Sequence, residues 1–148
     1  MNPAQPNLET ITSFNVYGLQ VRTKNSDEFN ANTAKLSELW QKFYASDLAH
    51  HTRIYGVYSN YESDANGLYT VTAGITDADH HPDFSMSIIP SGNYLVFKNR
   101  GPMPNTVIAT WQQVWDYFSK QPAYQRQFNS DFEAYTGPDE VAIYIGVQ

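Results

Sequence analysis

The 148-residue chain contains no cysteine, which excludes disulfide bonds, thiolate nucleophiles, and zinc or iron-sulfur sites held by cysteine. It also lacks any run of 18 apolar residues, and its first seven residues show neither the basic nor the apolar segment of a signal peptide. We therefore expect a cytoplasmic protein that has no membrane partner.

Basic residues are few, with 9 Lys and Arg against 15 Asp and Glu, so the formal net charge is −6. The basic residues are scattered singly, without the clusters that follow a phosphate backbone. We expect no direct contact with nucleic acid. The sequence also lacks a phosphate-binding glycine loop, a Gly-x-Ser-x-Gly elbow and a dinucleotide fingerprint, so no cofactor is expected.

Two histidine pairs, His50-His51 and His80-His81, raise the question of a metal site. Adjacent residues of a strand point to opposite faces, and Asp79 and Asp83 do not complete an established zinc spacing. We expect solvated loop or strand-end histidines and no metal.

Aromatic residues are abundant: 11 Tyr, 8 Phe and 3 Trp make up 15% of the chain. This exceeds what a domain of this size needs for packing. Some of these rings are therefore candidates to face a ligand.

Two halves of the chain repeat one order of elements. Strand-like residues 14–23 precede a helical pattern at 33–45 and two strand-like runs, and the same order follows from residue 94. The two helical stripes match at an offset of 75 residues: Leu36, Leu39, Trp40 and Phe43 against Trp111, Val114, Trp115 and Phe118.

This repeat predicts an α/β (α+β) fold of two tandem strand-helix-strand-strand units related by a pseudo-two-fold axis. Residues 1–11 are expected to be a tail, and residues 12–148 a single domain. The domain divides into repeat one (about 12–76), a polar linker (77–83) and repeat two (about 84–148). An aromatic-lined cleft between the two units is the expected ligand site.

Glu133 is the main candidate in that cleft. If Phe132 faces the helix together with Ile143, then Glu133, Tyr135 and Tyr144 share the opposite face of the strands. A carboxylate among aromatic rings suits a lipophilic cation, because Coulomb attraction adds to cation-π contacts of about 0.5–2 kcal/mol per ring. The alternative is a solvated Glu133 on an outer surface.

The remaining candidates come from the matched elements. Trp111 is a large ring where the other half has Leu36, and Phe29 and Met103 precede the two helices at equivalent places. Ligand contact and plain core packing both remain open for these residues and for Trp40 and Tyr69. A match of Asn60-Tyr61-Glu62 with Asp131-Phe132-Glu133 leaves open whether Glu133 is the one carboxylate of its kind.

A set of motifs in fixed order resembles the GyrI-like effector-binding domain of AraC-type and MerR-type multidrug-responsive regulators, which also occurs in stand-alone proteins. The motifs run from about residue 12 to 147 and include Gly18-Leu-Gln-Val-Arg-Thr, Ile54-Tyr-Gly-Val-Tyr58, Tyr94-Leu-Val-Phe97, Asp131-Phe-Glu-Ala-Tyr135 and Ile143-Tyr-Ile145. Among stand-alone members, the chain resembles the small proteins encoded by integron cassettes. The resemblance implies an aromatic cleft in which Glu133 meets lipophilic cations, lined by Tyr135 and Tyr144.

The chain departs from the family pattern in the last strand. Ala142 stands where many members have a second glutamate, and Gly146 where proline is common. The resemblance also implies a transcription-regulator module whose DNA-binding domain would have to come from a partner protein. Two further readings stay open: a hydrolase of strained electrophiles that uses Glu133 as general base with a tyrosine hydroxyl, and an acidic inhibitor of gyrase.

Overall fold

The computed structural model describes residues 6–28, 30, 32–46, 53–63, 67–76, 84–120 and 124–147. Its elements are β1 (Asn7–Ile11), β2 (Phe14–Thr23), α1 (Asn25–Glu28), α2 (Leu36–Tyr44), β3 (Ile54–Ser59), β4 (Tyr69–Ile75), β5 (Ser85–Ile89), β6 (Gly92–Arg100), α3 (Asn105–Ser119), β7 (Arg126–Gly137) and β8 (Glu140–Val147). The predicted order of strand, helix, strand and strand is therefore confirmed in both halves. Within the described ranges, no helix has the length and apolar character needed to cross a membrane.

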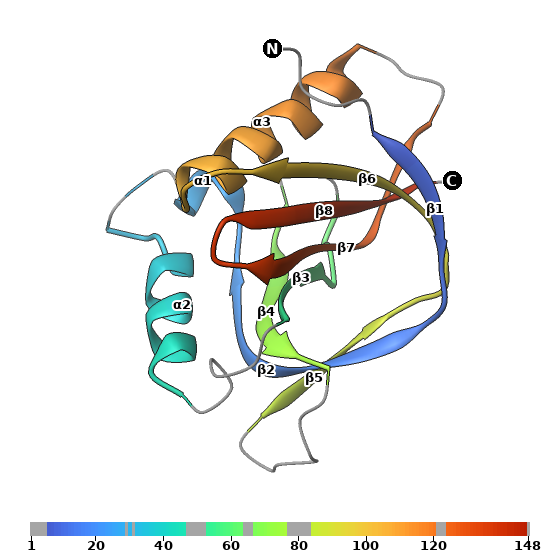
Figure 1. The fold of residues 1–148 in the computed structure, drawn as a ribbon. Helices are drawn as coiled ribbons and strands as arrows, with labels where there is room; N and C mark the ends of the chain where they lie inside the picture. The colour runs from blue at the N-terminus through green and yellow to red at the C-terminus, as the bar shows by residue number, and fades with distance from the viewer. Residues whose placement is uncertain are drawn as a thin grey trace.

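The eight strands form one antiparallel sheet in the order β1-β6-β8-β7-β3-β4-β2-β5. Each half contributes four strands, and the two halves meet where β3 pairs with β7 (Figure 1). The outermost strands are exchanged: β1 of the first half pairs with β6, and β5 of the second half pairs with β2. The order is thus symmetric about the β3–β7 junction, as a pseudo-two-fold axis requires.

The expectation that residues 1–11 form a tail is wrong for Asn7–Ile11, which are β1. This strand lies at an edge of the sheet, and none of its residues is buried. It therefore lacks the alternation of apolar and polar residues that marks a half-buried strand. β5 is the equivalent edge strand of the second half and was missed for a similar reason, since Ser85, Met86 and Ile88 are exposed.

The β3–β7 register locates the axis. Val57 lies directly opposite Phe132, and these two residues are 75 apart, the same offset that relates the helices. The residue that corresponds to Glu133 is therefore Tyr58, the next residue after Val57. The match of Glu62 with Glu133 is wrong, so no carboxylate occupies the symmetry-related place in β3.

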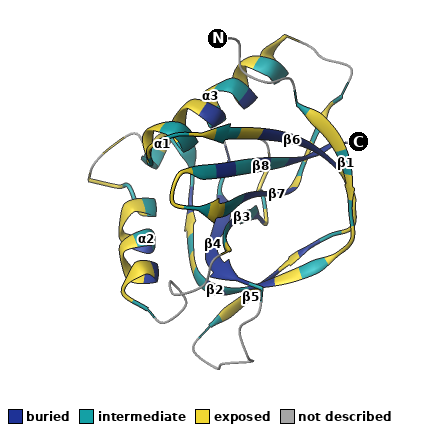
Figure 2. Cartoon of the chain, viewed as in Figure 1, coloured by how far each residue is buried: buried dark blue, intermediate teal, exposed yellow. Residues whose placement is uncertain are grey.

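The sheet buries side chains on both of its faces. α2 packs on one half through buried Leu39 and Phe43, and α3 packs on the other half through buried Val114. These are the stripes that the periodicity predicted. A third core lies on the opposite face and contains Val57 and Phe132. As a result the central strands are buried on both sides, and every residue of β4 is buried (Figure 2).

Some predicted features lie outside the described residues. These are Phe29, the linker 77–83 and all four histidines, His50, His51, His80 and His81.

Candidate functional site

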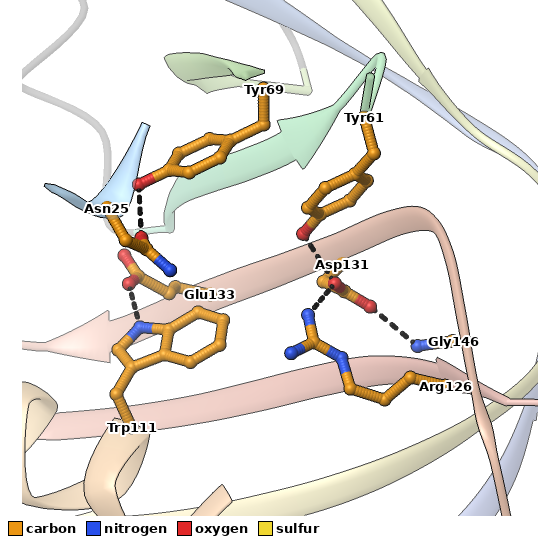
Figure 3. A network of polar contacts seen from close by, with 8 residues as sticks. All are labelled: Asn25, Tyr61, Tyr69, Trp111, Arg126, Asp131, Glu133 and Gly146. Atoms are coloured by element: carbon orange, nitrogen blue, oxygen red, sulfur yellow. Dashed lines mark hydrogen bonds and ion pairs between the residues drawn. The ribbon is translucent and has the colours of Figure 1, made fainter. Parts of the chain in front are cut away.

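Glu133 is a buried carboxylate with 3% of its surface exposed, on the sheet face that the helices cover. It accepts three side-chain hydrogen bonds. Tyr58 Oη and Trp111 Nε1 donate to Oε2 at 2.8 and 2.6 Å, and Tyr135 Oη donates to Oε1 at 2.8 Å. Tyr58 comes from the first half of the chain, Trp111 from α3 and Tyr135 from the same strand as Glu133 (Figure 3 shows the Trp111 bond). Residues from both halves therefore hold one carboxylate in place.

Burial dominates the electrostatics of this group. Removal from water raises the pKa of the Glu133 carboxyl above its usual value, while the hydrogen bonds from Trp111, Tyr58 and Tyr135 favour the charged form and oppose that rise. Burial together with the nearby carboxylate raises the pKa of Tyr58 and Tyr135 well above 10. Both tyrosines are thus neutral donors at any physiological pH.

Gly56 makes space for this arrangement. It pairs with Glu133 across the β3–β7 junction, and a Cβ atom at Gly56 would lie 2.7 Å from Glu133 Oε1 and 3.0 Å from Trp40 Cζ2. Both contacts are shorter than ordinary van der Waals distances. The Trp40 ring also meets Tyr135 edge to face, with centroids 5.8 Å apart. Only glycine leaves room for the carboxylate and the indole together.

Tyr144 does not share a face with Glu133, and the predicted grouping of these two residues is wrong. The β7–β8 register pairs Glu133 with Ile143 and Phe132 with Tyr144. The rings of Phe132 and Tyr144 stack at 4.4 Å on the opposite face of the sheet. The prediction placed Phe132 on the helix face together with Ile143, but the register of the two strands decides which residues share a face, and a shift of one residue exchanges the two faces.

A cavity of about 440 Å³ lies between the two halves, over the donors of Glu133. Its lining is predominantly aromatic and apolar: Asn25, Glu28, Leu36, Tyr58, Tyr61, Tyr69, Ile108, Trp111, Gln112, Trp115 and Arg126. The volume is in the usual range for small-molecule sites. Ile108 and Trp115 are among the exposed large apolar side chains of the protein, and their place in the lining accounts for that exposure.

The aromatic walls are held by ring contacts. Tyr58 meets Trp111 edge to face at 5.1 Å, Trp111 lies 6.2 Å from Trp115, and Tyr69 lies 5.7 Å from Tyr58 and 5.9 Å from Tyr61. These contacts fix the ring orientations before any ligand enters. Glu133 itself is not in the lining, so its charge acts from beneath Tyr58 and Trp111.

A second carboxylate, Glu28, does line the cavity. It accepts hydrogen bonds from Thr23 Oγ1 and from the backbone N–H groups of Lys35 and Leu36, so it caps α2, whose own N-cap side chain makes no such bond. Next to it, Tyr69 Oη donates to Asn25 Oδ1 at 2.7 Å (Figure 3). The cavity thus combines aromatic walls with negative charge at Glu28 and beneath its floor.

A buried ion pair lies beside the same cavity. Arg126 Nη2 is 2.7 Å from Asp131 Oδ2, and Asp131 also accepts from Tyr61 Oη at 2.5 Å and from the backbone N–H of Gly146 at 2.9 Å (Figure 3). Asp131 is fully buried. The two charges offset one another, so this pair leaves the negative field of Glu133 largely intact.

The structure brings five predicted site residues together around the cavity: Trp111, Leu36 and Tyr69 line it, and Glu133 and Tyr135 lie in the network beneath it. Trp40 contacts that network without lining the cavity. Met103 packs against the core under α3, away from the lining.

The sequence interpretation missed Tyr58, Tyr61, Trp115, Glu28 and Arg126. The offset of 75 residues, applied to Glu133 itself, would have found Tyr58. For Arg126 no short-range signal exists, because a bulge in β7 decides its position. Within the described residues, no group of three or more His, Asp or Glu side chains is placed to hold a metal ion.

Comparison with known proteins gives a family and a set of similar folds. The family described as integron-associated effector binding protein matches residues 7–147. The YobU protein of Bacillus subtilis (strain 168), named as a candidate transcriptional regulator, is 31% identical over 129 residues, which are 80% of this chain and 78% of that protein.

Two solved structures are similar along nearly the whole chain. The integron cassette protein VCH_CASS2 from the mobile metagenome of Vibrio cholerae is 37% identical, with a TM-score of 0.91 over 97% of this chain and 96% of that one. The protein SAV2435, solved with bound tetraphenylphosphonium, is 19% identical, with a TM-score of 0.74 over 98% of this chain and 94% of that one. With the family matched over residues 7–147, the chain belongs to the integron-associated effector-binding proteins.

Proposed function

We propose that the cavity between the two halves binds lipophilic aromatic cations, and that the protein serves as an effector-binding module that senses or captures them. One observation carries the proposal: the carboxylate of Glu133 is buried beneath an aromatic cavity and is held there by three donors. An apolar cavity for neutral ligands would gain nothing from a buried negative charge.

Two effects favour a cation here. A cation above the face of Tyr58, Trp111 or Trp115 gains about 0.5–2 kcal/mol from each ring that it contacts. It also lies near the charge of Glu133. At a separation of about 7 Å and an effective dielectric constant of about 20, that attraction is about 2 kcal/mol.

The relatives are consistent with this proposal. SAV2435, which shares the fold, was solved with a phosphonium cation, and YobU is named as a candidate regulator. The same residues argue against hydrolysis by Glu133. Its two oxygens already accept three hydrogen bonds, and Glu133 is absent from the cavity lining, whereas a general base must reach water or substrate directly.

Binding of tetraphenylphosphonium to the wild-type protein and to Glu133→Gln, measured by isothermal titration calorimetry, tests the proposal. We expect the variant to bind roughly 30-fold more weakly, which corresponds to about 2 kcal/mol. Glu38→Gln is the matched control, because Glu38 is exposed on α2 and pairs with Lys42. It removes the same charge at an exposed residue outside the cavity lining and should leave the affinity within about twofold.

Triphenylphosphine oxide provides the neutral comparison. Its affinity should be similar in the wild-type protein and in Glu133→Gln. Equal affinity of wild type and Glu133→Gln for the phosphonium would refute the role of the carboxylate. No binding of the phosphonium to the wild-type protein would refute the proposed function.

A further inference from the structure

Arg126 is a cavity-lining residue whose hydrogen bonding is incomplete. Its guanidinium uses Nη2 to pair with Asp131, and 9% of the side chain remains exposed. Among the described residues, Arg126 Nε is the buried side-chain nitrogen or oxygen that lacks a hydrogen-bond partner. Nε is buried, so a ligand in the cavity reaches this guanidinium through its Nη groups; the unpaired Nε–H shows that Asp131 leaves the charged group only partly hydrogen-bonded.

The chain holds Arg126 in this place at some conformational cost. The β7–β8 register shifts between Arg126 and Asp131, so β7 bulges there, and Phe128 within the bulge has a φ of 53°. A left-handed backbone at a phenylalanine is strained. The centroid of the Phe128 ring lies 4.3 Å from the guanidinium carbon of Arg126. The bulge therefore positions the guanidinium between Phe128 and the cavity.

Asp131 does not use up the binding capacity of this guanidinium. Asp131 divides its two oxygens among Arg126, Tyr61 and the backbone N–H of Gly146. A guanidinium carries five N–H donors in a fixed plane, which can serve two carboxylates at once. The ion pair cancels the repulsion that a lone arginine would exert on a cation, while N–H groups remain for an acceptor.

The spacing between the Arg126–Asp131 pair and Glu133 is set by β7, because Asp131 and Glu133 both lie on this strand. Asp131 and Glu133 are alternate residues on the same face of the strand, so their attachment points are about 7 Å apart. A ligand with a cation at one end of a benzene ring and a carboxylate at the other spans a comparable distance.

We propose that the cavity has two chemically distinct ends and prefers amphoteric aromatic ligands: a cationic group above Glu133, and a carboxylate or similar acceptor at Arg126. This inference rests on the proposed function for its cationic end. It adds a specificity-determining residue, Arg126, and a narrower ligand class.

The test compares two probes that differ in one charge: para-(trimethylammoniomethyl)benzoate and its methyl ester. Affinities come from NMR titrations of the wild-type protein, of Arg126→Lys and of Arg100→Lys. Arg126→Lys keeps the charge beside Asp131 but loses the planar fork of donors. Arg100→Lys is the matched control, because Arg100 is exposed and pairs with Glu140 away from this cavity.

We expect the free acid to bind the wild-type protein about tenfold more tightly than the ester, which is about 1.4 kcal/mol. The preference should persist in Arg100→Lys and fall below about threefold in Arg126→Lys, with folding of each variant checked by thermal denaturation. In the wild-type protein, the acid and not the ester should shift the Arg126 Nε–H resonance. That measurement decides the matter even if Arg126→Lys does not fold.

Three results would overturn the inference: no preference for the acid, a preference unchanged in Arg126→Lys, or binding of neither probe. Tetraphenylphosphonium separates this failure from failure of the proposed function. If tetraphenylphosphonium binds the wild-type protein while the acid binds no more tightly than its methyl ester, the cation site is supported and the role of Arg126 is refuted.

Discussion

Substitution of Gly56 by alanine is a direct test of how tightly the site is packed. The new methyl group would lie 2.7 Å from Glu133 Oε1 and 3.0 Å from Trp40 Cζ2. Neither neighbour moves freely, because Glu133 is buried and held by three hydrogen bonds, and Trp40 packs against Phe43 and Tyr135. Relief of the overlap requires a displacement of several tenths of an ångström, which weakens the bonds to Glu133.

The size of the effect follows from two opposing terms. Overpacking of a filled interior costs about 1–3 kcal/mol. Replacing glycine also stabilises by about 0.4–1 kcal/mol, since the unfolded chain loses conformational freedom. We therefore expect Gly56→Ala to lower the free energy of unfolding by about 1–2 kcal/mol, and Tm by roughly 3–8 °C for a chain of this length.

Gly137→Ala is the matched control. Gly137 ends β7, and a Cβ atom there would have no heavy atom within 4 Å. This variant should be as stable as the wild-type protein or slightly more so. Urea denaturation followed by circular dichroism gives both values. A Gly56→Ala protein as stable as Gly137→Ala would refute the packing described around Glu133.

Three further predictions concern the carboxylate network. Folding raises the pKa of Glu133, so the folded state binds the carboxyl proton more tightly than the unfolded chain does. The stability that this proton contributes is present below about pH 4.5 and is lost as the pH rises through the folded-state pKa. The free energy of unfolding of the wild-type protein should therefore fall relative to Glu133→Gln between pH 4 and pH 7.5, as urea denaturation would show; a constant difference would contradict the raised pKa. Trp111→Phe keeps a ring but removes a donor to Glu133, so it should destabilise by about 1–2 kcal/mol in the same assay, and no loss of stability would contradict that hydrogen bond. Tyr58→Phe should weaken phosphonium binding severalfold in calorimetry whereas Tyr144→Phe should not, since Tyr144 lies on the opposite face of the sheet; equal effects would contradict the face assignment.

The sequence predicted the large features of the fold because they depend on repeated local patterns. Leu39 and Phe43 form a helical stripe, and the offset of 75 residues relates them to Val114 and Phe118. Strand β1 carried no such pattern, since it is an edge strand without buried residues. Edge strands are defined by their partners in the sheet, and these lie far away in the sequence.

The candidate site was predicted in part. The choice of Glu133 and Trp111 placed two residues that hydrogen bond to each other. The faces of Glu133 and Phe132 were wrong, because strand register is a long-range property that alternation alone does not determine. Arg126 was missed for a related reason, as the bulge that directs it toward Asp131 is visible only in the paired strands.

A crystal structure of the protein in complex with tetraphenylphosphonium would test the central claim most directly. The account predicts the phosphonium between the two halves, in contact with Trp111 and Tyr58 and above the buried carboxylate of Glu133. A phosphonium bound instead on the opposite face of the sheet, against Phe14 and Tyr144, would contradict it.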